Sequence, residues 1–168
     1  NPESLYKAPA TVILIEEEDI IQRGYLDLEE LVHDLPGFDI SRSAGISYTH
    51  LYQRGYRSES TNRILFIIDG VEQNDIWSNV VRLSRQYPIS NIKSVEVVYG
   101  PASTIYGANA FLGVISIITK DPLEISKNNP NKKGKMNTGI VGQINLGSYN
   151  SKSIDVTMAI TINIITNT

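Results

Sequence analysis

Residues 95–120 constrain the fold most, because two stretches rich in valine and isoleucine flank a turn that contains three glycines. The first stretch ends in Gly100-Pro101. Glycine permits backbone conformations that other residues avoid, and proline fixes its own φ angle. We therefore predict a strand, a sharp turn with a short helical stretch that points Tyr106 inward, and a returning strand. The residues that define this turn are Gly100, Pro101, Tyr106, Gly107 and Gly113.

A glycine-rich turn between a strand and a helix is also found in sites that bind nucleotide phosphates. The details of this sequence argue against such a site. Neither Lys-Ser nor Lys-Thr follows Gly107, and the glycines do not have the spacing Gly-x-Gly-x-x-Gly. We therefore interpret the turn as an element that shapes the fold and holds no substrate, and we expect no cofactor.

The N-terminal part of the chain predicts an extended arm, one strand and two short helices. Residues 1–10 lack periodicity and contain two prolines, and residues 11–15 favour a strand. A first helix is expected between the acidic residues 16–19 and Gly24. Asp27 and Glu30 have the spacing of a capping box for a second helix. Its apolar stripe is formed by Leu28, Leu31, Val32 and Leu35.

The middle of the chain favours strands, at residues 38–41, 51–56 and 64–68. The apolar run 64–68 is typical of a central strand that is buried on both faces. Asp69-Gly70, which follows it, strongly favours a tight hairpin turn. The expected fold is therefore of the α+β class, with a central mixed sheet of about four strands flanked by short helices.

The sequence changes character after residue 120. Residues 121–137 are rich in asparagine, lysine and proline, as a linker would be, and residues 138–168 predict two strands. In residues 154–163 apolar and polar side chains alternate. This alternation is typical of a transmembrane barrel strand, but equally of an amphipathic strand in a soluble sheet. The expected organisation is an arm (1–10), a globular domain (11–120), a linker (121–137) and two barrel-like strands (138–168).

The composition argues against several classes of protein. Without cysteine the chain can form neither disulfides nor cysteine zinc sites. Its formal net charge is −3, and its single dense basic cluster is Lys132, Lys133 and Lys135, so we expect no binding to nucleic acid. No apolar run approaches about 18 residues, so no helix is expected to cross a bilayer.

Catalysis and metal binding have little support in the sequence. The two histidines, His33 and His50, have no acidic residue at a convincing metal-site spacing, and we expect no metal. Ser103, His50 and Asp69 form a hydrolase triad only on paper, because no nucleophile-elbow pattern surrounds the serine. The chain is therefore not expected to be an enzyme.

The loops hold the best candidates for binding. Aromatic and arginine side chains give large contact areas at low entropic cost, and residues 74–87 form a long stretch without clear periodicity. The candidates for ligand contact are Tyr48, His50, Trp77 and Arg82.

Three motifs follow one another in a fixed order along the chain. The longest is Val-Glu-Val-Val-Tyr-Gly-Pro at residues 95–101, followed by Ala-Ser-Thr-Ile-Tyr-Gly and by the strand that ends at Lys120. The others are Asp27-Leu28 with Leu35-Pro36-Gly37, and Gln53-Arg54-Gly55-Tyr56 followed by the apolar strand and Asp69-Gly70-Val71. Together the three motifs closely resemble those of TonB-dependent outer-membrane receptor plugs, over about residues 11–120.

The resemblance implies a plug that lies inside a β-barrel in the outer membrane of a Gram-negative bacterium. Such receptors bind a scarce nutrient, such as an iron-siderophore complex, haem, cobalamin or a glycan, and the energy-coupling protein TonB pulls on the plug. TonB adds a strand to a short N-terminal box. No convincing box is present in residues 1–10, so we expect it upstream.

The resemblance also implies a role for Arg54, whose counterpart faces acidic residues on the barrel wall and helps to lock the plug. Many relatives carry a second arginine where this chain has Tyr99. This difference leaves Arg54 as the main candidate for the lock. An ordinary ion pair of Arg54, at the surface or within the domain, is the alternative.

Residues 138–168 are too few for a barrel of 22 strands, which needs on the order of 200 residues. We therefore expect no transport by this chain alone and some self-association through its unpaired strands. The alternative function is a soluble periplasmic module for ligand binding or sensing that has no barrel.

Overall fold

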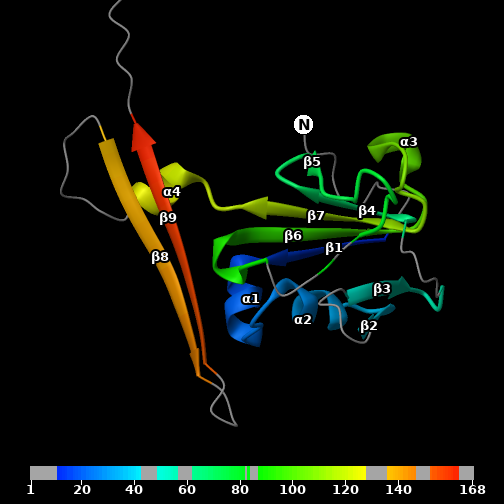
Figure 1. Ribbon diagram of the computed structural model, residues 1–168, viewed down its shortest axis with the longest axis horizontal. Helices are drawn as coiled ribbons and strands as arrows, with labels where there is room; N and C mark the ends of the chain where they lie inside the picture. The colour runs from blue at the N-terminus through cyan, green and yellow to red at the C-terminus, as the bar shows by residue number, and fades with distance from the viewer. Residues whose placement is uncertain are drawn as a thin grey trace, which may run out of the picture.

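The fold was analysed in a computed structural model that describes residues 11–42, 49–56, 62–81, 83, 87–127, 136–146 and 152–162. A five-stranded sheet forms its centre, as Figure 1 shows. Helices α1 and α2 and the hairpin β2–β3 lie together on one side of this sheet (Figure 1). The hairpin β8–β9 lies beyond the end of the sheet at which β7 finishes (Figure 1).

The sheet has the order β1-β6-β7-β4-β5 and is mixed, which confirms the predicted fold class. Strand β4 runs parallel to β7, and the other neighbouring pairs are antiparallel. The five strands are β1 (Thr11–Glu16), β4 (Ile64–Ile68), β5 (Val71–Glu72), β6 (Ile92–Tyr99) and β7 (Gly113–Thr119). The sheet exceeds the expected four strands by the two-residue β5.

The turn between β4 and β5 has the conformation that its sequence favours. Asp69 and Gly70 have φ angles of 49° and 81°, as a type I′ hairpin turn requires. The Asp69 carboxylate accepts hydrogen bonds from the backbone N–H of Thr119 at 2.8 Å and from its hydroxyl at 2.7 Å. The end of β4 is therefore tied to the end of β7.

Strand β4 is buried on both faces, as its apolar run predicts. Ile64 and Phe66 are fully buried in the larger core with residues of α1 and α2. Leu65 points to the opposite face, into a smaller core that includes Val98 and Val114. The sheet thus separates two hydrophobic layers.

The two predicted N-terminal helices are present as α1 (Glu17–Arg23) and α2 (Leu28–His33). Helix α1 ends at Gly24, whose φ angle of 70° is left-handed. The Asp27 side chain accepts a hydrogen bond from the backbone N–H of Glu30 at 2.9 Å and so caps α2. The whole predicted stripe is buried, namely Leu28, Leu31, Val32 and Leu35.

The hairpin of β2 (Phe38–Arg42) and β3 (Thr49–Gln53) forms a separate two-stranded sheet. The expected strand at 51–56 was wrong at its end, because Arg54 and Gly55 have φ angles of 50° and 77° and turn the chain. Gly37 also has a positive φ angle, and its carbonyl accepts the backbone N–H of Arg54 at 2.7 Å. The turn thereby closes against the start of β2.

The C-terminal part contains α4 (Pro122–Lys127), β8 (Met136–Leu146) and β9 (Lys152–Ile162), and a short 3₁₀ helix, η2 (Ile89–Asn91), precedes β6. Helix α4 lies within the stretch expected to be a linker. Strands β8 and β9 pair antiparallel along their whole length. No helix within the described parts of the chain is long and apolar enough to cross a membrane.

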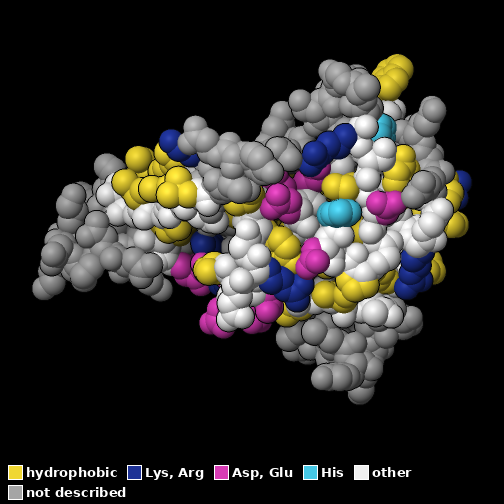
Figure 2. Space-filling view, turned by 90° about the horizontal axis from the view of Figure 1, so that it is seen from below, with side chains coloured by type: hydrophobic (Ala, Val, Ile, Leu, Met, Phe, Trp, Pro, Cys, Tyr) yellow, Lys and Arg dark blue, Asp and Glu magenta, His cyan; other side chains and the backbone are white. Residues whose placement is uncertain are grey.

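One face of the hairpin β8–β9 is apolar and exposed. Figure 2 shows the hydrophobic side chains gathered over this hairpin. They include Ile140, Ile144, Leu146, Ile154, Val156, Met158 and Ile160. On the other face Ala159 is buried and Asp155 and Thr157 are half-buried. The alternation seen in the sequence is therefore an alternation between two faces.

Candidate functional site

The candidate site lies at one end of the central sheet, here called the Gly113 end. Gly113 pairs with Tyr99 and with Ile64, and Tyr99 pairs with Thr11, so four strands begin or finish at this level. The turns that follow β3 and β6 and the residue that precedes β4 meet there. Connections at the end of a rigid sheet are common positions for binding residues.

The turn between β6 and β7 contains the short helix α3 (Ser103–Tyr106). Gly100 and Gly107 have φ angles of 108° and 90°, which other residues rarely adopt. Gly113 has no room for a side chain, because a Cβ atom would lie 2.5 Å from the carbonyl oxygen of Val98. Pro101 is exposed. These residues produce a tight connection of fixed shape.

The expectation that Tyr106 points inward is wrong. Its side chain is 37% exposed, and α3 has no buried residue. Ala102 and Ala110 occupy the inward positions and are joined by a backbone hydrogen bond of 3.0 Å. Partial burial, and secondarily the charge of Glu96, raise the pKa of the Tyr106 hydroxyl.

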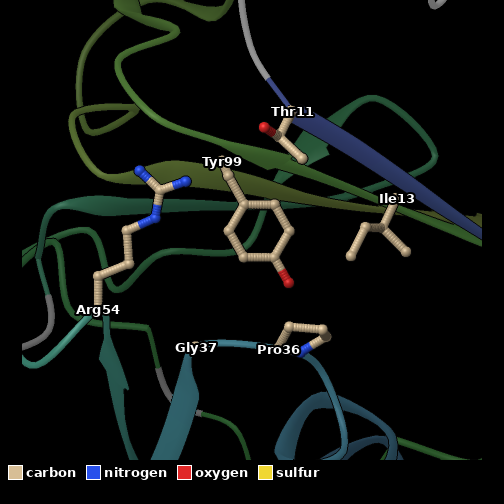
Figure 3. A pocket seen from close by; sticks show the side chains of 6 residues that line it. All are labelled: Thr11, Ile13, Pro36, Gly37, Arg54 and Tyr99. Atoms are coloured by element: carbon tan, nitrogen blue, oxygen red, sulfur yellow. The ribbon is translucent and has the colours of Figure 1, made fainter.

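Arg54 and Tyr99 line a cavity of about 280 Å³ together with Thr11, Ile13, Pro36 and Gly37. Figure 3 shows the guanidinium of Arg54 beside the Tyr99 ring, with the tyrosine hydroxyl directed between Ile13 and Pro36. The guanidinium carbon lies 5.6 Å from the ring centroid, a distance typical of a cation–π contact. Among the described residues, Arg54 has no carboxylate partner.

The Tyr99 side chain is 5% exposed, yet its hydroxyl has no hydrogen-bond partner among the described residues. Burial raises the pKa of this hydroxyl, and the nearby charge of Arg54 acts in the opposite direction. The side-chain amide of Gln53, next to Gly113, is also buried without a partner. A buried polar group that lacks a partner costs about 1–3 kcal/mol. This end of the sheet thus carries polar groups that the described residues leave unsatisfied.

Trp77 lies on an ordered turn. The Asp75 carboxylate accepts hydrogen bonds from the backbone N–H of Trp77 at 3.1 Å and of Ser78 at 2.8 Å. Asn79 donates its backbone N–H to the Asp75 carbonyl at 2.7 Å. Ile76 is fully exposed, and Trp77 is 97% exposed. The turn therefore presents two large apolar side chains to solvent.

Asn74 fixes this turn to the sheet. Its side-chain oxygen accepts the backbone N–H of Phe66, and its amide nitrogen donates to the carbonyl oxygens of Ile64 and Asn79, all at 2.9–3.0 Å. No local sequence pattern points to Asn74, because its partners are backbone groups of residues that lie elsewhere in the chain.

The remaining sequence candidates are not brought together. His50 is half-buried in β3 opposite Ser41, whereas Tyr48 and Arg82 lie outside the described residues. Ser103 lies at the Gly113 end and Asp69 at the opposite end of β4, so the hydrolase triad does not form. In the described parts of the chain, no group of histidine and acidic side chains could hold a metal ion.

Comparisons with known proteins point to one family. Residues 4–114 match the model of the TonB-dependent receptor plug domain. The chain is 31% identical over 111 residues to the vitamin B12 transporter BtuB of Vibrio vulnificus (strain CMCP6), a match that covers 66% of this chain and 18% of BtuB. The chain thus spans less than a fifth of the length of this curated relative.

Solved structures agree with this match at the level of the fold. The ferric yersiniabactin uptake receptor FyuA of Yersinia pestis has a TM-score of 0.56 at 21% identity, over 90% of this chain and 27% of that chain. The siderophore receptor PiuA of Acinetobacter baumannii has a TM-score of 0.57 at 23% identity, over 89% and 18%. A chain of the FpvAI–pyocin S2 complex has a TM-score of 0.64 at 18% identity, over 91% of this chain and 18% of that chain.

Proposed function

Because this chain belongs to the family of TonB-dependent receptor plug domains, we propose that it gates an outer-membrane receptor for an iron-siderophore complex or cobalamin. Plugs of this family lie inside the barrel of an outer-membrane receptor. The names of the relatives above include vitamin B12, ferric yersiniabactin and siderophores. Haem and glycans remain in the same proposal as alternative nutrients. The plug would break no bond and would need no cofactor of its own.

Ligand contact is assigned in this proposal to the turn that carries Ile76 and Trp77. The observation behind this assignment is that both side chains are exposed although the backbone of the turn is held by hydrogen bonds. An aromatic side chain on a rigid turn gives contact area at low entropic cost. His50, Tyr48 and Arg82 remain further candidates.

The lock to the barrel is assigned to Arg54. Its cation lies over the Tyr99 ring and has no carboxylate among the described residues, so a carboxylate of the barrel wall would complete the pair. The buried hydroxyl of Tyr99 also needs an acceptor in the cavity. Tyr99 would thereby replace the second arginine of many relatives. Its ring would support the Arg54 cation, and its hydroxyl would donate one additional hydrogen bond.

The hairpin β8–β9 is assigned to the start of the barrel. Its exposed apolar face would contact lipid, and the face with Ala159 would turn toward the plug. This apolar face favours a plug and barrel over a soluble periplasmic module, which would expose it to water. TonB would engage a box that lies upstream of residues 1–10 and would transmit force to the plug.

A transport experiment tests this proposal. In cells whose sole route for a ferric siderophore or for cobalamin is the full-length receptor, uptake of the radiolabelled nutrient should require TonB. Trp77→Ala should lower the apparent affinity, and Arg54→Gln should admit large antibiotics that the intact plug excludes. Receptor amounts in isolated outer membranes provide the control. Uptake that is independent of TonB for every nutrient tested would contradict the proposal.

A further inference from the structure

Arg63, which precedes β4 at the Gly113 end, contacts two aromatic rings. Its guanidinium carbon lies 4.9 Å from the centroid of the Tyr56 ring and 5.7 Å from that of the Phe111 ring. Both distances are in the range of cation–π contacts. No sequence motif points to Arg63 or Phe111, and the proposed lock at Arg54 does not involve them.

The three residues come from three separate segments, and backbone hydrogen bonds hold each segment in place. The carbonyl oxygen of Arg63 accepts the N–H of Phe111 at 3.1 Å and that of Leu112 at 2.8 Å. The N–H of Tyr56 donates to the carbonyl oxygen of Gln53 at 2.9 Å. The fold therefore fixes the backbone positions from which Tyr56, Arg63 and Phe111 meet.

The charge of Arg63 is not neutralised within the described residues. Arg23 and Arg42 have the carboxylates of Asp34 and Glu29 as partners, whereas Arg63 has none. Glu72, the acidic residue of the neighbouring β5, instead accepts a hydrogen bond from Asn109 at 2.9 Å. A guanidinium whose faces contact aromatic rings keeps its N–H edges available for hydrogen bonds.

Exposed apolar side chains also lie at the Gly113 end, where Arg63 is found. Phe111 is 62% exposed, and Ile105 of α3 is also exposed. Asn74, which holds the Trp77 turn, donates to the carbonyl of Ile64, the residue after Arg63. The Gly113 end thus combines an unpaired, oriented cation with aromatic and aliphatic surface.

We propose that the cluster of Tyr56, Arg63 and Phe111 is a binding site for a carboxylate group that is attached to an aromatic or aliphatic body. Two N–H groups of Arg63 bind the carboxylate oxygens in a fork, and Phe111 contacts the apolar body. The carboxylate comes either from the transported ligand or from the inner wall of the barrel. The existence of the site does not depend on the proposed function. Only the choice between the ligand and the barrel wall as the source of the carboxylate rests on it.

Titration of the isotopically labelled chain with sodium benzoate tests the site directly. The Nε–Hε signal of Arg63 should shift and saturate, benzyl alcohol should leave it unchanged, and the paired Arg23 should show no shift. Phe111→Leu should weaken binding several-fold, and Arg63→Gln should weaken it by about tenfold or more, because a charge-assisted hydrogen bond is lost. Arg63→Lys keeps the charge but cannot bind both carboxylate oxygens in a fork. Its affinity for benzoate should lie between those of the unmodified chain and Arg63→Gln. Equal shifts with benzyl alcohol, or unchanged binding in Arg63→Gln, would overturn the site.

Transport by the full-length receptor distinguishes the two sources. If the ligand supplies the carboxylate, Arg63→Gln should lower the affinity for a carboxylate-bearing chelate and spare one without a carboxylate. If the wall supplies it, the variant should admit large antibiotics and keep its ligand affinity. Normal affinity combined with normal antibiotic exclusion would overturn the proposal. Failure of the proposed function would differ, because the unmodified receptor would then show no TonB-dependent uptake of any nutrient.

Discussion

The hydroxyl of Thr49 donates a 2.7 Å hydrogen bond to the buried carboxylate of Glu29. The same carboxylate accepts the Nε–H of Arg42, also at 2.7 Å. Glu29 is 2% exposed, so helix α2 holds both strands of the hairpin β2–β3 through one buried anion. The other end of this hairpin, at Gln53, has an amide without a partner among the described residues. Phe38, which pairs with Gln53 at that end, instead packs edge-on against the Tyr99 ring at 5.6 Å.

Glu29→Ala should destabilise the chain by about 2–4 kcal/mol, because it leaves Thr49 and Arg42 without their buried acceptor. Urea unfolding followed by circular dichroism measures this loss. Glu18→Ala, at an exposed position of α1, should change the stability by less than about 1 kcal/mol. Equal losses in the two variants would contradict the assigned role of Glu29.

Gly113→Ala should prevent normal folding or cost more than about 3 kcal/mol, since the new methyl group would overlap backbone atoms. Its Cβ atom would lie 2.5 Å from the Val98 carbonyl and 2.9 Å from the Gln53 amide nitrogen. Gly142→Ala is the matched control, with a nearest approach of 3.3 Å. Thermal unfolding compares the two, and a smaller loss for Gly113→Ala would be unexpected.

Tyr99→Phe should leave the stability unchanged or raise it by up to about 1 kcal/mol, because it removes a buried hydroxyl that has no partner among the described residues and keeps the ring beneath Arg54. Tyr99→Leu should be destabilising, since the ring also packs edge-on against Phe38 at 5.6 Å. Melting temperatures distinguish the variants. A clear loss in Tyr99→Phe would reveal an acceptor for the hydroxyl within the chain itself.

The pH dependence of stability should differ between the unmodified chain and Tyr99→Phe. Burial raises the pKa of Tyr99, so the folded state favours the protonated hydroxyl. This contribution is fully present below the ordinary tyrosine pKa of about 10 and is lost as the pH rises through the higher pKa of the folded state. Urea unfolding from pH 8 to 11 should therefore show a steeper alkaline decline for the unmodified chain. If the unfolding free energies of the two proteins fell equally with pH, the raised pKa of Tyr99 would be contradicted.

Asn74→Ala should loosen the turn that carries Trp77, because three hydrogen bonds to the backbone are lost. Trp77 is the only tryptophan, so its fluorescence reports on this turn alone. Time-resolved anisotropy should show faster local motion in the variant. Quenching by acrylamide should change little, because the side chain is already exposed. Gln73→Ala is the control and should leave the anisotropy unchanged.

Elements that are specified by neighbouring residues could be predicted from the sequence. Asp27 and Glu30 set the start of α2, and Asp69-Gly70 set the turn after β4, since each pattern acts within a few residues. The end of β3 was misplaced because Arg54 adopts a positive φ angle that non-glycine residues rarely take. The contacts of Arg54 with Tyr99 and of Arg63 with Phe111 join residues more than 40 positions apart. Such contacts depend on sheet register, which no local pattern specifies.

The pairing of β1 with β6 also affects how the domain can be assembled. Thr11 finds its partner only when Tyr99 is available, so the first strand of the chain pairs with the sixth. Contacts between positions so distant in sequence slow folding, because a long loop must close before they form. During synthesis, a chain that has emerged only as far as β5 still lacks β6 and β7, which join β1 to β4 in the sheet. The strand order thus delays completion of the sheet until nearly the whole domain exists.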